Sequence, residues 1–412
     1  MKILFVCQYF YPEVFRGNDI AFYWAEEGHD VHVVTGIPNY PDGVFHKGYG
    51  LFKRRHEEII KDVQGVKEFK GIVRVTRLPI VPRGNNKILL MLNYFSYLFV
   101  AWLYMLFHAI FHKYDRVFVQ QLSPVMMSAP GVLYKRIRKV PLYTWVLDLW
   151  PESLTAAGGI NNKYILAFFK HYVKSQYKHS DMILTSSRSF EKSILEYGEY
   201  KDKIIYYPQW SDGSKGELIA PANVPVIPDG FKLMFAGAVG EAHGFECTMQ
   251  AALLAKEHKD IKWIIVGDGR KLDWVKQFVK DNGLEETVYT LGRFSAETMP
   301  WFFAQADVML VTLSDDPLFR LYAPAKISSY MAASKPIVAV LNGEGAEVIR
   351  EADCGWTIPA GDAEGFAKLA IELAQKEKIE LAAKGENAAT YYNEHFVKEK
   401  CLKKLDELMS LS

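Results

Sequence analysis

The chain has 412 residues, of which half are apolar and 24% carry a charged side chain. This composition is typical of a globular protein with sizeable cores, and it excludes a mostly disordered chain, a collagen-like chain and a coiled coil. The net charge is only +1, so bulk charge gives no reason to expect nucleic-acid binding.

Strand-like and helix-like segments alternate through the first half of the chain. Residues 2–6 form a continuous apolar run, typical of a central parallel strand buried on both faces. This start predicts a strand rather than a signal peptide. The β–α–β order implies right-handed crossovers, so residues 1–207 are predicted to form one Rossmann-like domain. Its expected segments are a loop at 8–17, a helix at about 18–27, and strands at 30–35, 72–78, 116–120, 142–147 and 182–185.

The second half repeats this organisation after a proline- and glycine-rich stretch at 208–230, which predicts a linker. Residues 231–395 are predicted to form a second doubly wound domain, and 396–412 a helix that packs back on the first. The expected fold class is therefore α/β, with two Rossmann-like domains facing a central cleft. The expected strands are 232–236, 261–266, 288–291, 308–312 and 337–341, with helices at about 245–258, 271–282, 297–305, 325–333, 363–376 and 379–395.

The cysteines indicate the compartment. Cys7, Cys247, Cys354 and Cys401 are scattered, and none belongs to a CxxC pair. This spacing argues against a zinc site or a dithiol motif and fits a reducing compartment, so a cytoplasmic protein is expected.

Residues 88–111 contain no charged residue. Length alone predicts a transmembrane helix. However, strand-like segments precede and follow the run, and two strands of one sheet cannot lie on opposite sides of a bilayer. A buried crossover helix, a helix embedded in the membrane surface and a true span remain as three alternatives. The tryptophan and tyrosine content supports the second, because these residues prefer the membrane interface. Basic clusters at 53–55 and 135–139 could add attraction to anionic lipid, although a solvated face is their default interpretation.

The second domain opens with a glycine-rich strand-to-helix turn. Gly237, Gly240 and Gly244 would let backbone amides approach a phosphate at a helix N-terminus, although a plain tight turn has the same composition. The sequence is not GxGxxG, which disfavours binding of a redox dinucleotide. Lys326 begins a later predicted helix, where its charge could lie beside phosphates; a solvated surface lysine is the alternative.

In the first domain, the sequence Asp-Leu-Trp-Pro-Glu-Ser follows the strand at 142–147. Active-site groups collect at such strand ends in open α/β sheets. Asp148 could act on a sugar hydroxyl, or it could cap the following helix. The chain has no Asp-x-Asp pair to hold a metal on a diphosphate, and no GxSxG, HExxH or P-loop motif.

Taken together, these segments resemble a retaining glycosyltransferase of family 4 with the GT-B fold. The similarity is greatest to the branch of O-antigen fucosaminyl-type and colanic-acid transferases, and it runs over nearly the whole chain. The segments that carry it are QYFYPEVFRGNDIA, GHDVHVVTGIPNYPDG, HKGYGLFKRR, LDLWPESL, FAGAVGEAHGFE, IIVGDGR, LGRFSAETMPWFFAQADVMLVTL and PAKISSYMAASKPIVAVLNGEGAEVI.

The resemblance implies a nucleoside-diphosphate sugar as co-substrate, with no cofactor and no metal. Lys326 and Asp148 are the expected catalytic residues. The diphosphate is expected to meet the glycine turn and the helix start, and the base and ribose the two loops that follow; these donor-binding residues are Gly240, Glu241, His243, Gly244, Gly267, Asp268, Gly269, Arg293, Phe294, Pro324, Ala325, Lys326 and Ser329. The acceptor-binding residues are expected to be Gly17, Asn39, Trp150 and Glu152.

The branch also implies a lipid-linked saccharide acceptor and a peripheral position at the inner face of the plasma membrane, in O-antigen, capsule or exopolysaccharide synthesis. Two positions depart from the family pattern, because a pair of glutamates eight residues apart is replaced by Leu321 and Ser329. This departure keeps open a non-catalytic nucleotide-sugar-binding protein. A GT-B-fold epimerase acting on a free nucleotide sugar is the other alternative.

Overall fold

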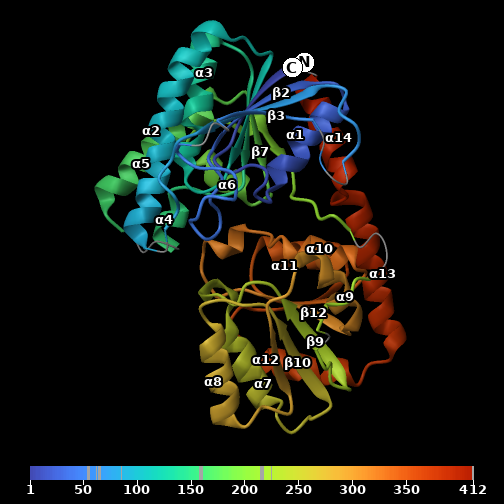
Figure 1. Ribbon diagram of the computed structural model, residues 1–412. Helices are drawn as coiled ribbons and strands as arrows, with labels where there is room; N and C mark the ends of the chain where they lie inside the picture. The colour runs from blue at the N-terminus through green and yellow to red at the C-terminus, as the bar shows by residue number, and fades with distance from the viewer. Residues whose placement is uncertain are drawn as a thin grey trace. The chain divides into compact units, whose positions relative to one another are not determined.

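A computed structural model of the protein describes residues 1–52, 56–61, 63, 66–84, 86–156, 161–213, 218–223 and 225–410. The basic cluster at 53–55 lies outside the described residues. The chain divides into two compact units. Met1–Tyr207 and Leu402–Ser412 form the first, and Pro208–Cys401 forms the second. In Figure 1, helices flank the sheet of each unit.

Among the described residues, the first unit contains an eight-stranded sheet with the strand order β3-β4-β2-β1-β5-β6-β7-β8. Neighbouring strands pair in parallel, except β3 with β4. We call the edge where the parallel strands end the carboxyl edge. The strands are β1 (Lys2–Val6), β2 (Asp30–Gly36), β3 (Glu57–Ile60), β4 (Ile72–Leu78), β5 (Arg116–Gln121), β6 (Leu142–Val146), β7 (Met182–Thr185) and β8 (Ile204–Tyr206).

Helices cover both faces of this sheet because alternate residues of each central strand point to opposite sides. Leu4 and Val6 pack beneath α2, whereas Phe5 packs edge-to-face on Trp24 of α1. The helices are α1 (Arg16–Glu26), α2 (Lys87–Phe111), η1 (Val125–Ser128), α3 (Ala129–Arg138), α4 (Glu152–Ala156), α5 (Lys163–His179), α6 (Phe190–Leu195) and η2 (Lys201–Lys203).

The second unit is a parallel α/β sandwich. Its described strands form a six-stranded sheet with the order β11-β10-β9-β12-β13-β14. Leu233 and Phe235 face a core shared with α7, α8 and α12, while Met234 and Ala236 face the opposite core. The strands are β9 (Phe231–Ala236), β10 (Ile261–Val266), β11 (Val288–Gly292), β12 (Val308–Thr312), β13 (Ile337–Val340) and β14 (Gly355–Ile358).

The helices of this unit follow its strands in the βα order that the sequence predicts. They are η3 (Glu241–His243), α7 (Phe245–Leu254), α8 (Leu272–Asn282), η4 (Ala296–Thr298), α9 (Met299–Gln305), η5 (Phe319–Leu321), α10 (Lys326–Ala332), α11 (Glu344–Glu351), α12 (Ala363–Ala374) and α13 (Lys378–His395). A last helix, α14 (Lys398–Ser410), contains the residue at which the second unit ends.

The start of the stretch 208–230 packs within the second unit. Trp210 and Ser211 are buried, and Ser211 Oγ donates to the carbonyl oxygen of Ser328 at 3.1 Å. The end of the chain also has fixed contacts, since Asp406 of α14 accepts a hydrogen bond from His29 Nε2 at 2.9 Å within the first unit. Trp210, Ser211 and α14 therefore belong to packed units.

Helix α2 connects β4 to β5 and packs on the sheet along only one narrow side. Asn93, Tyr97, Ala101 and Met105, spaced four residues apart, are buried beneath it. Only 22% of its most apolar window is buried, so the interpretation of α2 as a helix buried on most faces is wrong. Among the described residues, α2 is the helix long and apolar enough to cross a membrane by length and composition.

Candidate functional site

The residues that could bind a phosphate in the second unit surround the end of β9. Here the chain passes from Ala236 through Gly237 and Gly240 to Gly244, which precedes α7 in a left-handed conformation with φ +56°. A Cβ atom at Gly267 would lie 1.8 Å from the carbonyl oxygen of Gly237. The loop after β10 can therefore approach the loop after β9 this closely only because glycine stands at position 267.

Lys326 is the first residue of α10, and its ammonium group points into this region. Its Nζ lies 3.7 Å from the centre of the Phe235 ring, and an added Cβ at Gly237 would meet Nζ at 3.2 Å. Nζ is shielded from solvent and makes no hydrogen bond with the described residues. Burial lowers the pKa of Lys326 to about 7. A buried ammonium without an anion is unstable in a low-dielectric site, so this position favours binding of a negatively charged group.

His243 also packs against Phe235, with a distance of 5.6 Å between the ring centroids. Its backbone oxygen accepts a hydrogen bond from Thr312 Oγ1 at 2.6 Å. Burial, and secondarily the charge of Lys326, lowers the pKa of His243 to about 4. The imidazole is therefore neutral near pH 7 and adds no positive charge beside Lys326.

Glu241 of the turn and Glu246 of α7 are held by a cation that was not predicted from the sequence. Lys271 contacts Glu246 and Glu241, the latter at 3.2 Å. The hydrogen bond to Glu246 raises the pKa of Lys271. Glu241 thus acts within the protein as the partner of a lysine. The signal in the sequence was the Arg-Lys pair immediately after VGDG.

The remaining predicted donor residues have local roles in the structure. Asp268 Oδ1 accepts from the Gly269 amide at 2.7 Å, within the turn. Phe294 packs on Phe302 with 4.6 Å between ring centroids, and Arg293 is exposed. In α10 and the residue before it, Ser328 Oγ donates to the carbonyl oxygen of Ala325 at 2.8 Å. Pro324 accepts from the Ile327 amide, and Ser329 is half-buried.

Asp148 lies at the carboxyl edge of the first sheet, just beyond β6, and its carboxylate is engaged. Ser153 Oγ donates to Oδ1 at 2.5 Å, and Ser123 Oγ donates to Oδ2. Trp150 is buried, and its Nε1 donates to the same Ser123 hydroxyl at 2.9 Å. Glu152 accepts from Ser193 Oγ at 2.9 Å. The contacts of Asp148 and Trp150 with Ser123 join the loops after β5 and β6, and the contact of Glu152 joins α4 to α6.

The other two predicted acceptor residues lie elsewhere along this edge. Gly17 is the second residue of α1 rather than part of a loop, and an added Cβ there would lie 2.2 Å from Gln120 Oε1. Asn39 is buried and makes two side-chain hydrogen bonds, from Nδ2 to the oxygen of Ile37 and from the Arg83 amide to Oδ1. Both residues shape the loops beside β1 and β2.

A cation at this edge was not predicted from the sequence. Arg83 follows β4, and its Nη1 donates to the hydroxyls of Tyr9 at 3.0 Å and Tyr94 at 3.3 Å. Its guanidinium also lies 5.5 Å from the centre of the Tyr40 ring. The described residues include no carboxylate paired with Arg83. The guanidinium is therefore held in place by neutral groups and retains its charge for an anion.

Comparison with known proteins identifies the second unit. Residues 230–376 match the family model described as glycosyl transferases group 1. This segment is a glycosyltransferase domain. It contains Lys326, the glycine turn and Lys271, whereas Asp148 and Arg83 lie outside the matched region.

Two curated relatives agree with this assignment. The chain is 28% identical over 251 residues to a probable glycosyltransferase, WbjE, of Pseudomonas aeruginosa, an alignment that covers 58% of this chain and 62% of the relative. It is 24% identical over 307 residues to WcaI of Escherichia coli K12, named a putative colanic acid biosynthesis glycosyl transferase, with 71% of each chain covered. The first alignment thus spans somewhat less than two thirds of its relative.

A solved structure gives the fold. The Anabaena protein Alr3699/HepE in complex with UDP superimposes with a TM-score of 0.67 at 17% identity, over all of both chains. The predicted GT-B fold and the predicted glycosyltransferase class of the enzyme are confirmed.

Proposed function

We propose that this protein transfers a sugar from a nucleoside-diphosphate sugar to a lipid-linked saccharide during synthesis of a bacterial surface polysaccharide. One observation carries the donor half of this proposal: the Lys326 ammonium is buried beside a glycine turn with no hydrogen-bond partner in the described part of the chain, inside the glycosyltransferase domain. A diphosphate would supply the missing negative charge. A relative named for colanic acid biosynthesis and a similar structure in complex with UDP support the substrate classes.

The reaction that we infer retains the anomeric configuration. The bond between the sugar C1 and the phosphate oxygen breaks, a bond from C1 to the acceptor oxygen forms on the same face, and the leaving diphosphate takes the acceptor's proton. Negative charge grows on the diphosphate in the transition state, so a fixed ammonium stabilises that state more than the bound substrate. We assign this role to Lys326. No metal is required by this scheme.

On the acceptor side, we assign Arg83 to the phosphate groups of the lipid carrier. Arg83 combines a charge that is not paired with a described carboxylate with a position just before α2, whose outer face is apolar. A lipid-linked saccharide joins sugar, phosphate and hydrocarbon in that order. Arg83 lies between the carboxyl edge and an apolar helix, so it is placed to bind the phosphate that lies between the sugar and the hydrocarbon.

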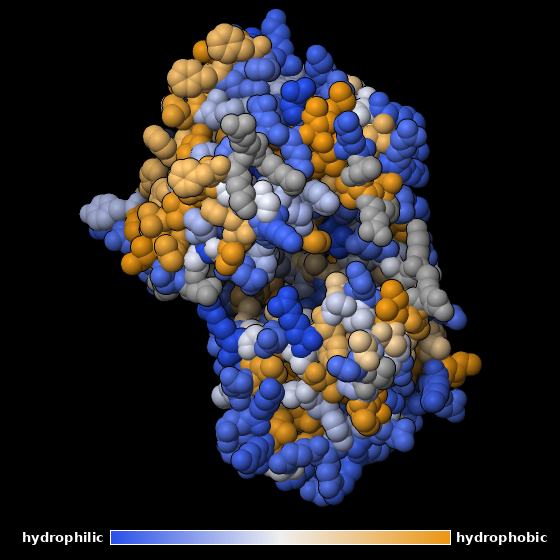
Figure 2. Space-filling model, in the orientation of Figure 1, coloured by the Kyte–Doolittle hydropathy of each residue, from blue (hydrophilic) through white to orange (hydrophobic). Residues whose placement is uncertain are grey.

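The membrane part of the proposal rests on the outer face of α2. Its exposed side chains include Phe99, Trp102, Phe107 and Phe111, and α5 adds Phe168. Figure 2 shows apolar side chains gathered over the side where Figure 1 labels α2 and α5. Because β4 and β5 belong to one sheet, α2 cannot cross a bilayer without splitting that sheet. We therefore propose that α2 lies in the interface at the cytoplasmic face of the membrane.

The test is incubation with a panel of UDP-, GDP- and dTDP-sugars, with and without a lipid-diphosphate saccharide acceptor, while nucleotide release is measured. The proposal expects release that depends on the acceptor. Interconversion of the free sugar nucleotides without an acceptor would identify the epimerase instead. Binding without either reaction would identify the non-catalytic alternative. The glycosyltransferase domain favours transfer over both.

A further inference from the structure

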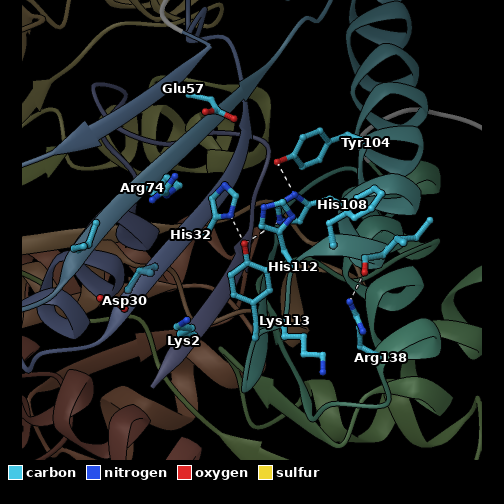
Figure 3. Close-up of a pocket in the computed structure, with 15 residues that line it drawn as sticks. Lys2, Asp30, His32, Glu57, Arg74, Tyr104, His108, His112, Lys113 and Arg138 are labelled. Atoms are coloured by element: carbon cyan, nitrogen blue, oxygen red, sulfur yellow. Dashed lines mark hydrogen bonds between the residues drawn. The ribbon is translucent and has the colours of Figure 1, made fainter.

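A cavity of about 730 Å³ lies in the first unit, away from the carboxyl edge. The starts of β1, β2 and β4 contribute Lys2, Asp30 and Ile72 to its wall, and the last turns of α2 contribute the opposite side. Figure 3 shows this arrangement, with the strands on one side and Tyr104 and His108 of α2 on the other. The parallel strands begin at this edge of the sheet, which is opposite the carboxyl edge. The cavity is therefore separate from the residues assigned to sugar transfer.

A chain of hydrogen bonds forms the floor of the cavity. His32 Nε2 bonds to Thr76 Oγ1 at 2.8 Å, and its Nδ1 bonds to the hydroxyl of Tyr114. The same hydroxyl bonds to His108 Nε2 at 2.8 Å. Burial lowers the pKa of His32 to about 3 and that of His108 to about 4. The floor is therefore polar but neutral near pH 7.

The positive charge comes from the rim. Lys2, Arg74 and Lys113 line the cavity, and among the described residues none of them forms an ion pair. Arg138 also lines it and donates to the carbonyl oxygen of Ile110 at 2.6 Å. Two carboxylates, of Asp30 and Glu57, lie on the same rim. Four cations against two carboxylates leave the rim positive.

The cavity borders the apolar face of α2. Ile110 and Phe111 line it and are 57% and 77% exposed. A positive, polar pocket that opens beside exposed hydrocarbon side chains matches a molecule with a phosphate at one end and hydrocarbon at the other. We propose that this cavity binds the phosphate headgroup of an anionic membrane lipid, whose acyl chains lie along α2. The inference rests on the membrane contact proposed above and adds a specific headgroup site to it.

The experiment compares two double variants that remove equal charge. Arg74→Gln with Lys113→Gln changes the cavity rim. Arg136→Gln with Lys170→Gln changes exposed cations on α3 and α5, outside the cavity. Binding is measured by co-sedimentation with vesicles of phosphatidylcholine alone or mixed with phosphatidylglycerol. We expect the rim variant to lose about fivefold in affinity for the mixed vesicles per charge removed, and the control variant less than twofold.

Equal losses in the two variants would overturn the site, because diffuse attraction of all nearby cations would then explain the binding. Retained binding of the rim variant would also overturn it, while leaving the membrane contact of α2 intact. If the wild type co-sediments with neither type of vesicle, the proposed membrane contact is wrong, and the headgroup site is wrong with it. The nucleotide-release panel with a soluble acceptor decides separately whether sugar transfer stands.

Soluble probes distinguish the source of the phosphate. Dihexanoyl-phosphatidylglycerol below its micelle concentration and inorganic phosphate are titrated into the full-length wild type and the rim variant by calorimetry. We expect the short-chain lipid to bind the wild type more tightly than phosphate does, and the rim variant to lose this binding. Equal affinity for both probes would identify a site for free phosphate and overturn the lipid assignment.

Discussion

The two candidate charged residues of this protein have opposite surroundings. Lys326, in the glycosyltransferase domain, is buried against Phe235 with no hydrogen-bond partner among the described residues. Asp148, at the carboxyl edge of the first sheet, has hydroxyl donors on both of its carboxylate oxygens. A group whose interactions are incomplete depends on a ligand, whereas one that is satisfied internally holds its loops in place. The difference predicts that the two residues respond differently to substitution.

Replacement of Lys326 is expected to have the largest effect. Lys326→Met should weaken binding of the nucleoside diphosphate by about ten- to a hundredfold, because a charge-assisted contact of about 1.5–3 kcal/mol is lost. Turnover should fall as well, since charge grows on the leaving phosphate. Calorimetry with the nucleotide identified by the donor panel, followed by steady-state kinetics, checks both effects.

The stability of that variant provides an internal control. Because the ammonium is buried without a partner, its removal should leave the free energy of unfolding unchanged or raise it. Thermal melting without nucleotide measures this. A variant that melts well below the wild type and binds normally would show that Lys326 supports the fold and that the phosphate site lies elsewhere.

The pH dependence of donor binding follows from the same group. With a pKa of about 7 in the free protein, Lys326 is protonated below pH 7, and a bound diphosphate favours the protonated form. Affinity should be full below pH 7 and fall by up to about tenfold per pH unit above it. Calorimetry in buffers of different ionisation enthalpy should detect proton uptake on binding near pH 8. An affinity that does not change from pH 6 to 9 in the wild type would contradict the assignment. So would a pH dependence that persists in Lys326→Met.

Asp148→Asn should produce a smaller and different effect. Asparagine keeps the size of the side chain, but its amide nitrogen cannot accept from a serine hydroxyl, so the contact with either Ser123 or Ser153 weakens. We expect lower turnover, nearly unchanged donor affinity and a loss of about 0.5–1.5 kcal/mol in the free energy of unfolding. Ser153→Ala is the matched variant: equal kinetic losses in both would make Asp148 a positioning residue, and full activity of Asp148→Asn would exclude a catalytic role.

Substitution of Arg83 tests its proposed role in binding the acceptor. Arg83→Gln should raise the KM for a lipid-diphosphate acceptor by about five- to tenfold, corresponding to about 1–1.4 kcal/mol, and leave donor affinity unchanged. Arg83→Lys keeps the charge and should recover part of the loss. A KM that does not change in either variant would remove the phosphate role from Arg83.

The smallest expected effect concerns metal. Because Lys326 supplies the positive charge in the proposed reaction, transfer should persist in excess EDTA. Loss of activity that manganese or magnesium restores would show that a divalent ion shares this role.

The sequence alone determined the fold class and the order of its elements. A central parallel strand is buried on both faces and therefore needs a continuous apolar run, such as residues 2–6. Such a run can be recognised from the sequence alone. The edge strands β3, β8 and β14 were not predicted, because an edge strand needs less apolar sequence than a central one. The start of α10 at Lys326 was predicted from local pattern. The resemblance to a glycosyltransferase depended on motifs that are contiguous in the chain.

Only the tertiary structure decided the state of each charged group. Lys326 and Lys271 are the same residue type, yet Lys326 has no hydrogen-bond partner in the described part of the chain and Lys271 contacts two carboxylates. Arg83 became a candidate because Tyr9 and Tyr94, distant in sequence, hold its guanidinium. The apolar run at 88–111 left three interpretations open until packing exposed most of its surface. Burial and pairing are properties of neighbours in space, and a single sequence records only neighbours along the chain.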